Sequence, residues 1–158
     1  MSVLCCFAPN ARARPLHFQL GESARAIVEH NELPENNLIA HTTLSVTDYR
    51  KAKAFYIAAL APLGYKNNME YGESAGFNDG KNTDFWISKE KSVVPTHLAF
   101  EASSQHQVEA FYKAALKAGA KDNGGPGYRD YWPGYYAAFV LDADGNNIEA
   151  VWYDYSKK

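Results

Sequence analysis

The chain has 158 residues, of which 46% are hydrophobic and 22% charged, and its formal net charge is -2 at pH 7. This balance excludes a disordered tail protein, and the small acidic charge provides no basic field for a nucleic acid. No apolar run approaches the roughly 20 residues of a membrane span, so a soluble globular domain is expected. The only two cysteines, Cys5 and Cys6, are adjacent, which excludes a disulfide framework and fits a reducing compartment.

Residues 1–37 are interpreted as an N-terminal extension that is expected to be partly disordered. Arg12 and Arg14 precede the first acidic residue, Glu22, and a short apolar patch runs from Val3 to Ala8. This pattern is compatible with organelle targeting, although the apolar stretch is short for a secretory signal. A cytoplasmic location is therefore the expectation, and organelle targeting is the alternative.

An internal repeat organises the rest of the chain. When the sequence is shifted by 56 positions without gaps, residues 41–60 align with residues 97–116, and seven of the 20 positions are identical. The identities are one His, then Ala-Phe-Tyr and Ala-Ala-Leu, where chance would give about one or two. We interpret residues 38–154 as one domain made of two tandem copies, module one (38–90) and module two (95–154).

Each copy has the pattern of a β-α-β-β-β unit. It opens with a strand-like apolar run, Leu38–Val46 in the first copy and Thr96–Ala102 in the second. A helix follows, in which apolar residues recur at i, i+3, i+4, i+7 and i+8, and it ends at Gly64 or Gly119. Turn residues then separate short strands, which are predicted at 64–71, 74–78 and 83–88, and at 128–132, 135–141 and 147–153. The sequence therefore predicts the α+β class, with tandem β-α-β-β-β modules forming a curled mixed sheet around a cleft.

Two histidines, His41 and His97, occupy equivalent places in the two opening strands. The pseudo-twofold axis of a duplicated unit is expected to bring them together, and Glu149 is the only carboxylate in the otherwise apolar last strand. We expect His41, His97 and Glu149 to bind a divalent metal ion with open positions for substrate. This donor set suits Fe, Mn, Ni or Zn without distinguishing among them. The alternative is that both histidines are ordinary strand residues and Glu149 is a structural acid.

Three segments resemble the vicinal oxygen chelate superfamily, which includes glyoxalase I, fosfomycin-resistance thiol transferases, bleomycin-resistance proteins and extradiol dioxygenases. These segments are IAHTTLSVTD around His41, THLAFEA around His97, and YYAAFVLDADGNNIEAVWY, which contains Glu149. The resemblance covers roughly residues 38 to 154. It implies the glyoxalase/bleomycin-resistance/dihydroxybiphenyl-dioxygenase fold, metal ligands at the three residues already named, and Glu149 as the catalytic residue.

Two departures from the family pattern distinguish among its members. Glyoxalase I has a further glutamate in the last strand of its first module, but the matching stretch Thr83–Ile87 contains no Glu, and Asp84 is its only carboxylate. Fosfomycin enzymes and extradiol dioxygenases tend to place a Tyr ten residues before the metal Glu, where this chain has Phe139. Strict glyoxalase I chemistry is thereby disfavoured, because a second carboxylate moves the proton of its substrate.

The sequence around the expected cleft is rich in aromatic residues. We expect Arg129 to contact an anionic group of the substrate, and Tyr131, Trp86 and Phe139 to line a pocket for a flat or hydrophobic molecule. The alternative is that most of these aromatics belong to the core and to strand edges, where aromatic residues are common.

The leading interpretation is a metal-dependent enzyme of the glyoxalase/dioxygenase-like superfamily. It would act on a small oxygen-bearing substrate by a lyase, isomerase or ring-cleaving oxygenase step, and an aromatic substrate is one expected class. The alternative is a metal-free small-molecule binding protein of the bleomycin-resistance kind. The expected partners are a small-molecule substrate and a second copy in a homodimer, with no nucleic acid and no membrane.

Overall fold

The computed structural model of the protein describes residues 39–157. The N-terminal extension of residues 1–37, with its expected disorder and its targeting alternative, lies outside the described residues. No helix in the described part of the chain is long and apolar enough to cross a membrane.

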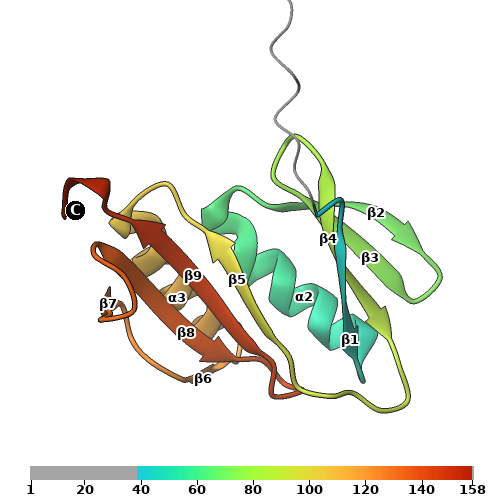
Figure 1. The fold of residues 1–158 in the computed structure, drawn as a ribbon. Helices are drawn as coiled ribbons and strands as arrows, with labels where there is room; N and C mark the ends of the chain where they lie inside the picture. Colours follow the sequence, from blue (N-terminus) through green and yellow to red (C-terminus); the bar gives the residue numbers. More distant parts are fainter. Residues whose placement is uncertain (1–38, 158) are drawn as a thin grey trace, which may run out of the picture. The chain divides into compact units, whose positions relative to one another are not determined.

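The first module is an open mixed sheet that packs against one helix (Figure 1). Its elements are β1 (Thr42–Val46), α2 (Tyr49–Leu60), the 3-10 turn η1 (Ala61–Leu63), β2 (Lys66–Tyr71), β3 (Ser74–Asn78) and β4 (Thr83–Lys89). The strand order is β1-β4-β3-β2, in which β1 is parallel to β4 and the other neighbours are antiparallel.

The second module repeats this arrangement in a sheet of its own. Its elements are β5 (His97–Glu101), α3 (Gln105–Lys117), β6 (Lys121–Asp122), β7 (Gly127–Tyr128), β8 (Tyr135–Leu141), β9 (Asn147–Tyr153) and the 3-10 turn η2 (Tyr155–Lys157). The strand order is β5-β9-β8-β6, with β5 parallel to β9 and with β7 also pairing to β8. The α+β class predicted from the sequence is therefore confirmed, and the strands form two open mixed sheets.

The predicted strand 128–132 is wrong, because only its first residue belongs to a strand. The Tyr135 N–H donates to the carbonyl of Trp132 (3.0 Å), so the chain turns back at this point. Gly134, at φ 77°, makes this turn, and its Cα lies so close to the Asp154 carbonyl that an added Cβ would sit 2.1 Å from the oxygen. An aromatic run with strand propensity is thus interrupted by a turn that a distant segment helps to define.

Side-chain caps explain why both helices begin where they do. The Asp48 carboxylate accepts a hydrogen bond from the Lys51 N–H at the start of α2 (3.1 Å), and Ser104 does the same for the Gln107 N–H in α3 (3.3 Å). Each satisfies a backbone donor that has no partner within the helix. The predicted stop at Gly119 (φ 102°) is confirmed, since its N–H bonds to the Leu116 carbonyl (3.1 Å).

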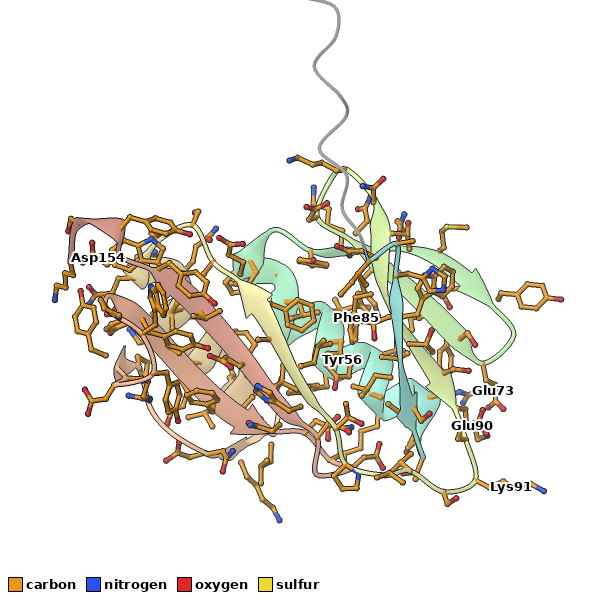
Figure 2. All side chains as sticks on the ribbon, viewed as in Figure 1. Tyr56, Glu73, Phe85, Glu90, Lys91 and Asp154 are labelled. Atoms are coloured by element: carbon orange, nitrogen blue, oxygen red, sulfur yellow. The ribbon has the colours of Figure 1, made fainter. Side chains whose placement is uncertain are left out.

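The two modules share one hydrophobic core. The helices α2 and α3 pack against each other, and the core-facing sides of both sheets cover them. Phe100 of β5 makes edge-to-face contacts with Phe85 of β4 (5.1 Å between ring centroids) and with Tyr65 (5.3 Å). Figure 2 shows Phe85 beside the fully buried Tyr56 of α2, and these rings are 5.1 Å apart. Apolar burial and aromatic contacts therefore join the modules within one chain.

A buried polar contact joins the modules at the turn between β8 and β9. The Tyr56 hydroxyl of module one donates to Asp142 Oδ2 of module two (2.7 Å). Asp142 also accepts from the side-chain amide of Asn146 (2.8 Å) and from the N–H groups of Asn146 and Asp144 (2.8 and 2.9 Å). Thr47 donates to both carboxylate oxygens of Asp144. The Asp-Ala-Asp-Gly-Asn turn thus also holds module two against module one through hydrogen bonds from Tyr56 and Thr47.

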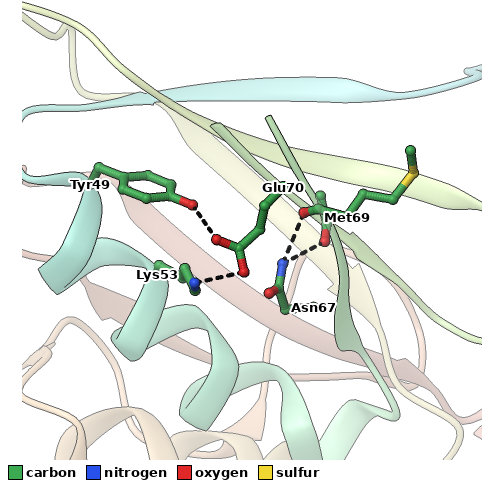
Figure 3. Close-up of polar contacts among 6 residues, drawn as sticks. Tyr49, Lys53, Asn67, Met69 and Glu70 are labelled. Carbon is green, nitrogen blue, oxygen red and sulfur yellow. Dashed lines mark hydrogen bonds and ion pairs between the residues drawn. The ribbon is translucent and has the colours of Figure 1, made fainter. Parts of the chain in front are cut away.

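An exposed polar contact fixes α2 against the edge strand β2 (Figure 3). Glu70 accepts from the Tyr49 hydroxyl (2.9 Å) and from Lys53 Nζ (2.7 Å), both of which lie on α2. Hydrogen bonding to Lys53 and then to Tyr49 lowers the pKa of Glu70 below its usual value. Because all three groups are near the surface, this contact orients the strand more than it stabilises the fold.

Strand alternation leaves each sheet with a second face, which we call the outer face. In β9, Ile148 and Ala150 belong to the shared core, so Asn147 and Glu149 point to the opposite side. The same alternation places His97 of β5 and Phe139 of β8 on the outer face of the second sheet. In the first sheet, Leu44 and Val46 mark the core-facing side in the same way. Because Glu149, His97 and Phe139 all lie on the outer face of the second sheet, that face holds most of the predicted site.

Candidate metal centre

His97 and Glu149 meet on the outer face because β5 and β9 are parallel neighbours. In their register His97 lies opposite Asn147 and Ala99 lies opposite Glu149, so the His97 ring leans one pair along the sheet toward the carboxylate. The distance from His97 Nε2 to Glu149 Oε2 is 3.2 Å. The Glu149 side chain is only 2% exposed, whereas that of His97 is 52% exposed. A buried carboxylate thus meets an accessible imidazole.

Tyr135 of β8 occupies the other oxygen of the carboxylate. Its hydroxyl donates to Glu149 Oε1 over 2.6 Å. Burial, followed by the hydrogen bond to Glu149 and its negative charge, raises the pKa of Tyr135 well above that of a free phenol. The phenol therefore keeps its proton and remains a donor at neutral pH. One carboxylate oxygen is held by Tyr135, and the other faces His97.

The far nitrogen of the His97 ring contacts Asn147. The Asn147 side-chain Nδ2 is 2.9 Å from His97 Nδ1, and the backbone carbonyl of Asn147 is 3.2 Å from the same atom. Asn123 Nδ2 in turn donates to Asn147 Oδ1 (3.0 Å). A support for the outer ring nitrogen is typical of metal-ligating histidines, because it fixes ring orientation and tautomer.

The geometry of His97 and Glu149 fits two ligands of one divalent ion. With metal–ligand bonds of about 2.1 Å, adjacent donors lie about 3.0 Å apart in octahedral and about 3.4 Å apart in tetrahedral coordination. The observed 3.2 Å between Nε2 and Oε2 falls between these values. The carbonyl of Asn147 is placed to accept a proton on Nδ1, which would leave the Nε2 lone pair for a metal. The donor set, imidazole and carboxylate, suits Fe, Mn, Ni or Zn equally.

His41 does not join these two residues within the described chain. It directly precedes β1 and is exposed. Among residues 39–157 no group of three or more His, Cys, Asp or Glu side chains comes close enough to hold a metal ion. The predicted convergence of His41, His97 and Glu149 is therefore not found inside a single chain, and the role of His41 as a ligand remains a prediction.

Trp86 occupies the position in module one that Glu149 occupies in module two. Thr43, two residues after His41, pairs with Trp86, just as Ala99, two residues after His97, pairs with Glu149. The glutamate that the resemblance to glyoxalase I would place here is thus a tryptophan. Asp84, the other candidate, is held elsewhere, because its Oδ2 accepts from the Tyr65 hydroxyl (3.0 Å).

Arg129 and Phe139 lie beside the metal-centre candidates. The Arg129 guanidinium stands 5.5 Å from the centre of the Phe139 ring, and His97 packs against the same ring at 6.4 Å between centroids. Arg129 is held there by the Gly125 carbonyl, which accepts from its Nη2 (2.5 Å). The ring of Tyr131 makes an edge-to-face contact with Tyr135 (5.4 Å). Of the four predicted substrate contacts, Phe139 therefore packs against His97, and Arg129 and Tyr131 each lie one residue further out. Trp86 lies on the sheet of the other module.

An open hollow adjoins this group on the side of the loop before β8. Its volume is about 560 Å³, and it lies against exposed aromatic and basic side chains. Its charged and aromatic lining residues are Tyr128, Arg129, Asp130, Tyr131, Trp132 and Lys157. Two cations against one acid leave this lining with a net positive charge, and with its aromatic rings it suits a flat anionic molecule.

Comparison with known proteins identifies the family. The family model of the Glyoxalase/Bleomycin resistance protein/Dioxygenase superfamily matches residues 38–150. The chain belongs to this superfamily. No curated protein sequence matches it significantly.

Solved structures agree with the family assignment. A glyoxalase/bleomycin resistance protein from Albidiferax ferrireducens is 28% identical, with a TM-score of 0.64, covering 73% of this chain and 98% of that one. A lactoylglutathione lyase from Agrobacterium tumefaciens is similar in fold, with 18% identity, a TM-score of 0.58, and 76% and 96% of the two chains covered. A glyoxalase/bleomycin resistance protein/dioxygenase family enzyme from Burkholderia phytofirmans also has a TM-score of 0.58, with 18% identity and 73% and 98% coverage. This superfamily typically uses divalent metals, which is consistent with the donor pair on the second sheet.

Two residues of the site, Asn147 and Asn123, were not identified from the sequence. Tyr135 belongs to the aromatic residues expected around the cleft, but its hydrogen bond to Glu149 was not predicted. Tyr135 and Asn147 carry a usable signal, since Tyr135 lies four residues before Phe139 and Asn147 two before Glu149, on the same faces of their strands. Asn123 carries none, because it reaches the site from a loop whose course depends on tertiary contacts.

Proposed function

We propose that the protein is a metal-dependent enzyme that acts on a small oxygen-bearing substrate, with an aromatic anion as the favoured class. The single observation that carries the proposal is the pairing of the buried Glu149 with the accessible His97 at 3.2 Å. Burying a carboxylate is costly unless a cation or hydrogen-bond donors compensate it, and an accessible imidazole beside it completes two positions of a metal site.

We propose that a second copy of the chain supplies the third ligand, the partner subunit's His41. The helix-side faces of both modules are occupied by the shared core, so the outer faces remain available to another chain. His41 is exposed beside the outer face of module one, at the position equivalent to His97. A homodimer that places module one of one copy against module two of the other would form two equivalent sites.

In this proposal each residue of the chain has a distinct task. A bound divalent ion would polarise a substrate oxygen or lower the pKa of a bound water to about 7. Glu149 supplies the negative charge that retains the ion, and Tyr135 fixes the orientation of its carboxylate. Arg129 attracts the anionic group of the substrate, while Phe139 and Tyr131 contact its flat face. A lyase, isomerase or ring-cleaving oxygenase step is compatible with these roles.

The second candidate function is metal-free binding of a small aromatic molecule. It is favoured by one observation, the open aromatic hollow beside Arg129, whose lining includes neither His97 nor Glu149. A binding protein would retain its ligand affinity when the metal ligands are removed.

A complementation experiment tests the proposed site. The variants His41→Ala and Glu149→Ala are each expected to bind Zn²⁺ poorly, because each lacks one ligand in both sites of the dimer. After unfolding and refolding together, mixed dimers should regain one complete site, built from His41 of one chain and from His97 and Glu149 of the other. Each mixed dimer has one complete site, and random pairing makes half of all dimers mixed. Isothermal titration of the refolded mixture should then detect about half a Zn²⁺ site per dimer on average.

Controls define what would contradict the proposal. Two variants that fail in the same half-site, His97→Ala and Glu149→Ala, should not complement each other. Recovery in that control, or no recovery in the His41 and Glu149 mixture, would exclude the shared site. Wild-type protein that binds no divalent metal but binds aromatic anions equally well with and without Glu149 would establish the second candidate function.

A further inference from the structure

A chain of hydrogen bonds runs through the site from the loop before β7 to the strand β8. Asn123 Nδ2 donates to Asn147 Oδ1 (3.0 Å), and Asn147 Nδ2 lies 2.9 Å from His97 Nδ1. His97 Nε2 is 3.2 Å from Glu149 Oε2, whose other oxygen accepts from Tyr135. Several of these hydrogen bonds have a fixed donor and acceptor, because an amide NH₂ only donates and a carboxylate only accepts.

The orientation of the Asn147 amide favours one position for the proton of His97. Asn147 Nδ2 lies 2.9 Å from Nδ1, and because an amide NH₂ only donates, this contact is a hydrogen bond when Nδ1 carries no proton. The proton of the neutral ring is then on Nε2, where it donates to Glu149 Oε2. The amide of Asn147 keeps this orientation because its oxygen is already bonded by Asn123.

The opposite arrangement is available within the same contacts. If both amides turn over, Asn147 Nδ2 donates to Asn123 Oδ1 and Asn147 Oδ1 faces His97 Nδ1. The Asn147 carbonyl, 3.2 Å from Nδ1, is a second acceptor on that side. The ring proton then moves to Nδ1, and the lone pair of Nε2 faces the carboxylate of Glu149. That juxtaposition is repulsive without a cation and favourable with one.

We infer that Asn123 and Asn147 form a two-state amide relay that sets the tautomer of His97, with the proton on Nε2 in the metal-free protein and on Nδ1 when a divalent cation is bound. The part of the inference that concerns the metal-free protein depends only on the hydrogen bonds that link Asn123, Asn147 and His97 to Glu149. The cation half rests on the proposed function. Both asparagines are positioning residues, because they act on the site through His97.

The test uses ¹⁵N-labelled full-length protein and long-range ¹H–¹⁵N correlation spectra of His97, recorded without metal at a pH where the ring is neutral. The Nδ1 signal of the wild type is expected in the unprotonated region. In Asn123→Asp the new side chain only accepts, so Asn147 must turn its NH₂ toward residue 123 and its oxygen toward His97. Nδ1 is then expected to become protonated, although residue 123 does not contact the ring.

The double variant Asn123→Asp/Asn147→Ala is the matched control. It carries the same added charge but lacks the amide that would transmit it, so its His97 spectrum should match that of Asn147→Ala alone. A protonated Nδ1 in the metal-free wild type would overturn the relay. A double variant whose His97 spectrum matches that of Asn123→Asp and differs from that of Asn147→Ala would also overturn it, because the effect would then be one of charge alone.

Zn²⁺, which is diamagnetic, tests the second half. Added Zn²⁺ should protonate Nδ1 in the wild type, and Asn147→Ala should bind Zn²⁺ about tenfold more weakly, as is typical when a histidine loses its supporting partner. Zn²⁺ binding that leaves Nδ1 unprotonated would refute the cation half of the relay. Absence of any Zn²⁺ binding would refute the proposed function while the metal-free spectra still decide the amide relay.

Discussion

Replacing Tyr56 with Phe should weaken the connection between the two modules without disturbing either sheet. The lost interaction is a hydrogen bond of 2.7 Å from a fully buried hydroxyl to the carboxylate of Asp142, which is itself 7% exposed. A buried hydrogen bond to a charged acceptor contributes about 1.5–3 kcal/mol. We therefore expect Tyr56→Phe to lower the free energy of unfolding by about 2 kcal/mol.

Asp142→Ala should cost more, because it leaves three fully buried donors without their acceptor. These are the Tyr56 hydroxyl, the side-chain amide of Asn146 and the backbone N–H of Asn146. Each unpaired buried donor costs about 1–3 kcal/mol, so the expected total is about 6 kcal/mol. In the double variant no hydrogen bond between the two side chains is left to lose, and the Tyr56 hydroxyl that Asp142→Ala leaves unpaired is absent. The double variant should therefore be about 4 kcal/mol more stable than the sum of the single effects predicts.

Urea unfolding followed by circular dichroism measures all three variants against the wild type. Tyr49→Phe is the matched control, because Tyr49 lies on the same helix and its hydroxyl bonds to the exposed Glu70. This control should unfold at the urea concentration of the wild type. A coupling energy below about 0.5 kcal/mol between Tyr56 and Asp142 would show that this hydrogen bond does not stabilise the contact between the two modules.

Three further predictions concern the carboxylate, the pH dependence and the loop before β8. Glu149→Gln should keep the hydrogen bond from Tyr135 and most of the stability, but weaken Zn²⁺ binding by more than the 10–100-fold typical of losing a supporting residue. Unchanged Zn²⁺ binding in calorimetry would end its assignment as a ligand, and Glu101→Gln, at an exposed position of β5, is the control. Burial, followed by the charge of Asp142, raises the pKa of Tyr56 well above 10.0, so its contribution to stability is complete below pH 10.0 and is lost as the pH rises toward the folded-state pKa. Unfolding curves of the wild type and Tyr56→Phe should converge at strongly alkaline pH, and a constant difference would contradict this sign. Gly134→Ala should destabilise the protein by about 3 kcal/mol or more, because its φ is 77° and the new Cβ would lie 2.1 Å from the Asp154 carbonyl; a thermal midpoint equal to that of the wild type would show that the turn relaxes.

Much of the fold follows from local patterns that a sequence displays directly. The 3.6-residue spacing of apolar residues in 52–60 and 108–116 and the two terminating glycines locate both helices. Alternating residues and the Asp-Ala-Asp-Gly-Asn turn locate β8 and β9, whose bounds agree with the predicted strands. These features depend on neighbours a few residues away, so they can be predicted without the rest of the molecule. The segment 128–132 was mispredicted because its turn depends on contact between Gly134 and Asp154.

The candidate site divides in the same way. The repeat indicates that His41 and His97 are equivalent, and the isolated carboxylate indicates Glu149. The parallel register of β5 and β9 then places His97 and Glu149 together, as the sequence led us to expect. Asn123 could not be assigned, because its contact depends on the path of a loop. The hydrogen bond from Tyr135 to Glu149 depends on side-chain packing across strands, although the position of Tyr135 in β8 carries a signal.

The amino-acid sequence by itself therefore determined the two modules, both helices and most strands, and the residue types of the site. Only the tertiary structure decided which surfaces of the modules face each other within one chain. A repeated unit has the same apolar faces in both copies, so its sequence is compatible with outer faces that meet in one chain or between two chains. The choice depends on long-range contacts, the Phe85–Phe100 packing and the Tyr56–Asp142 hydrogen bond, which cover the helix-side faces and leave His97 and Glu149 on an open one.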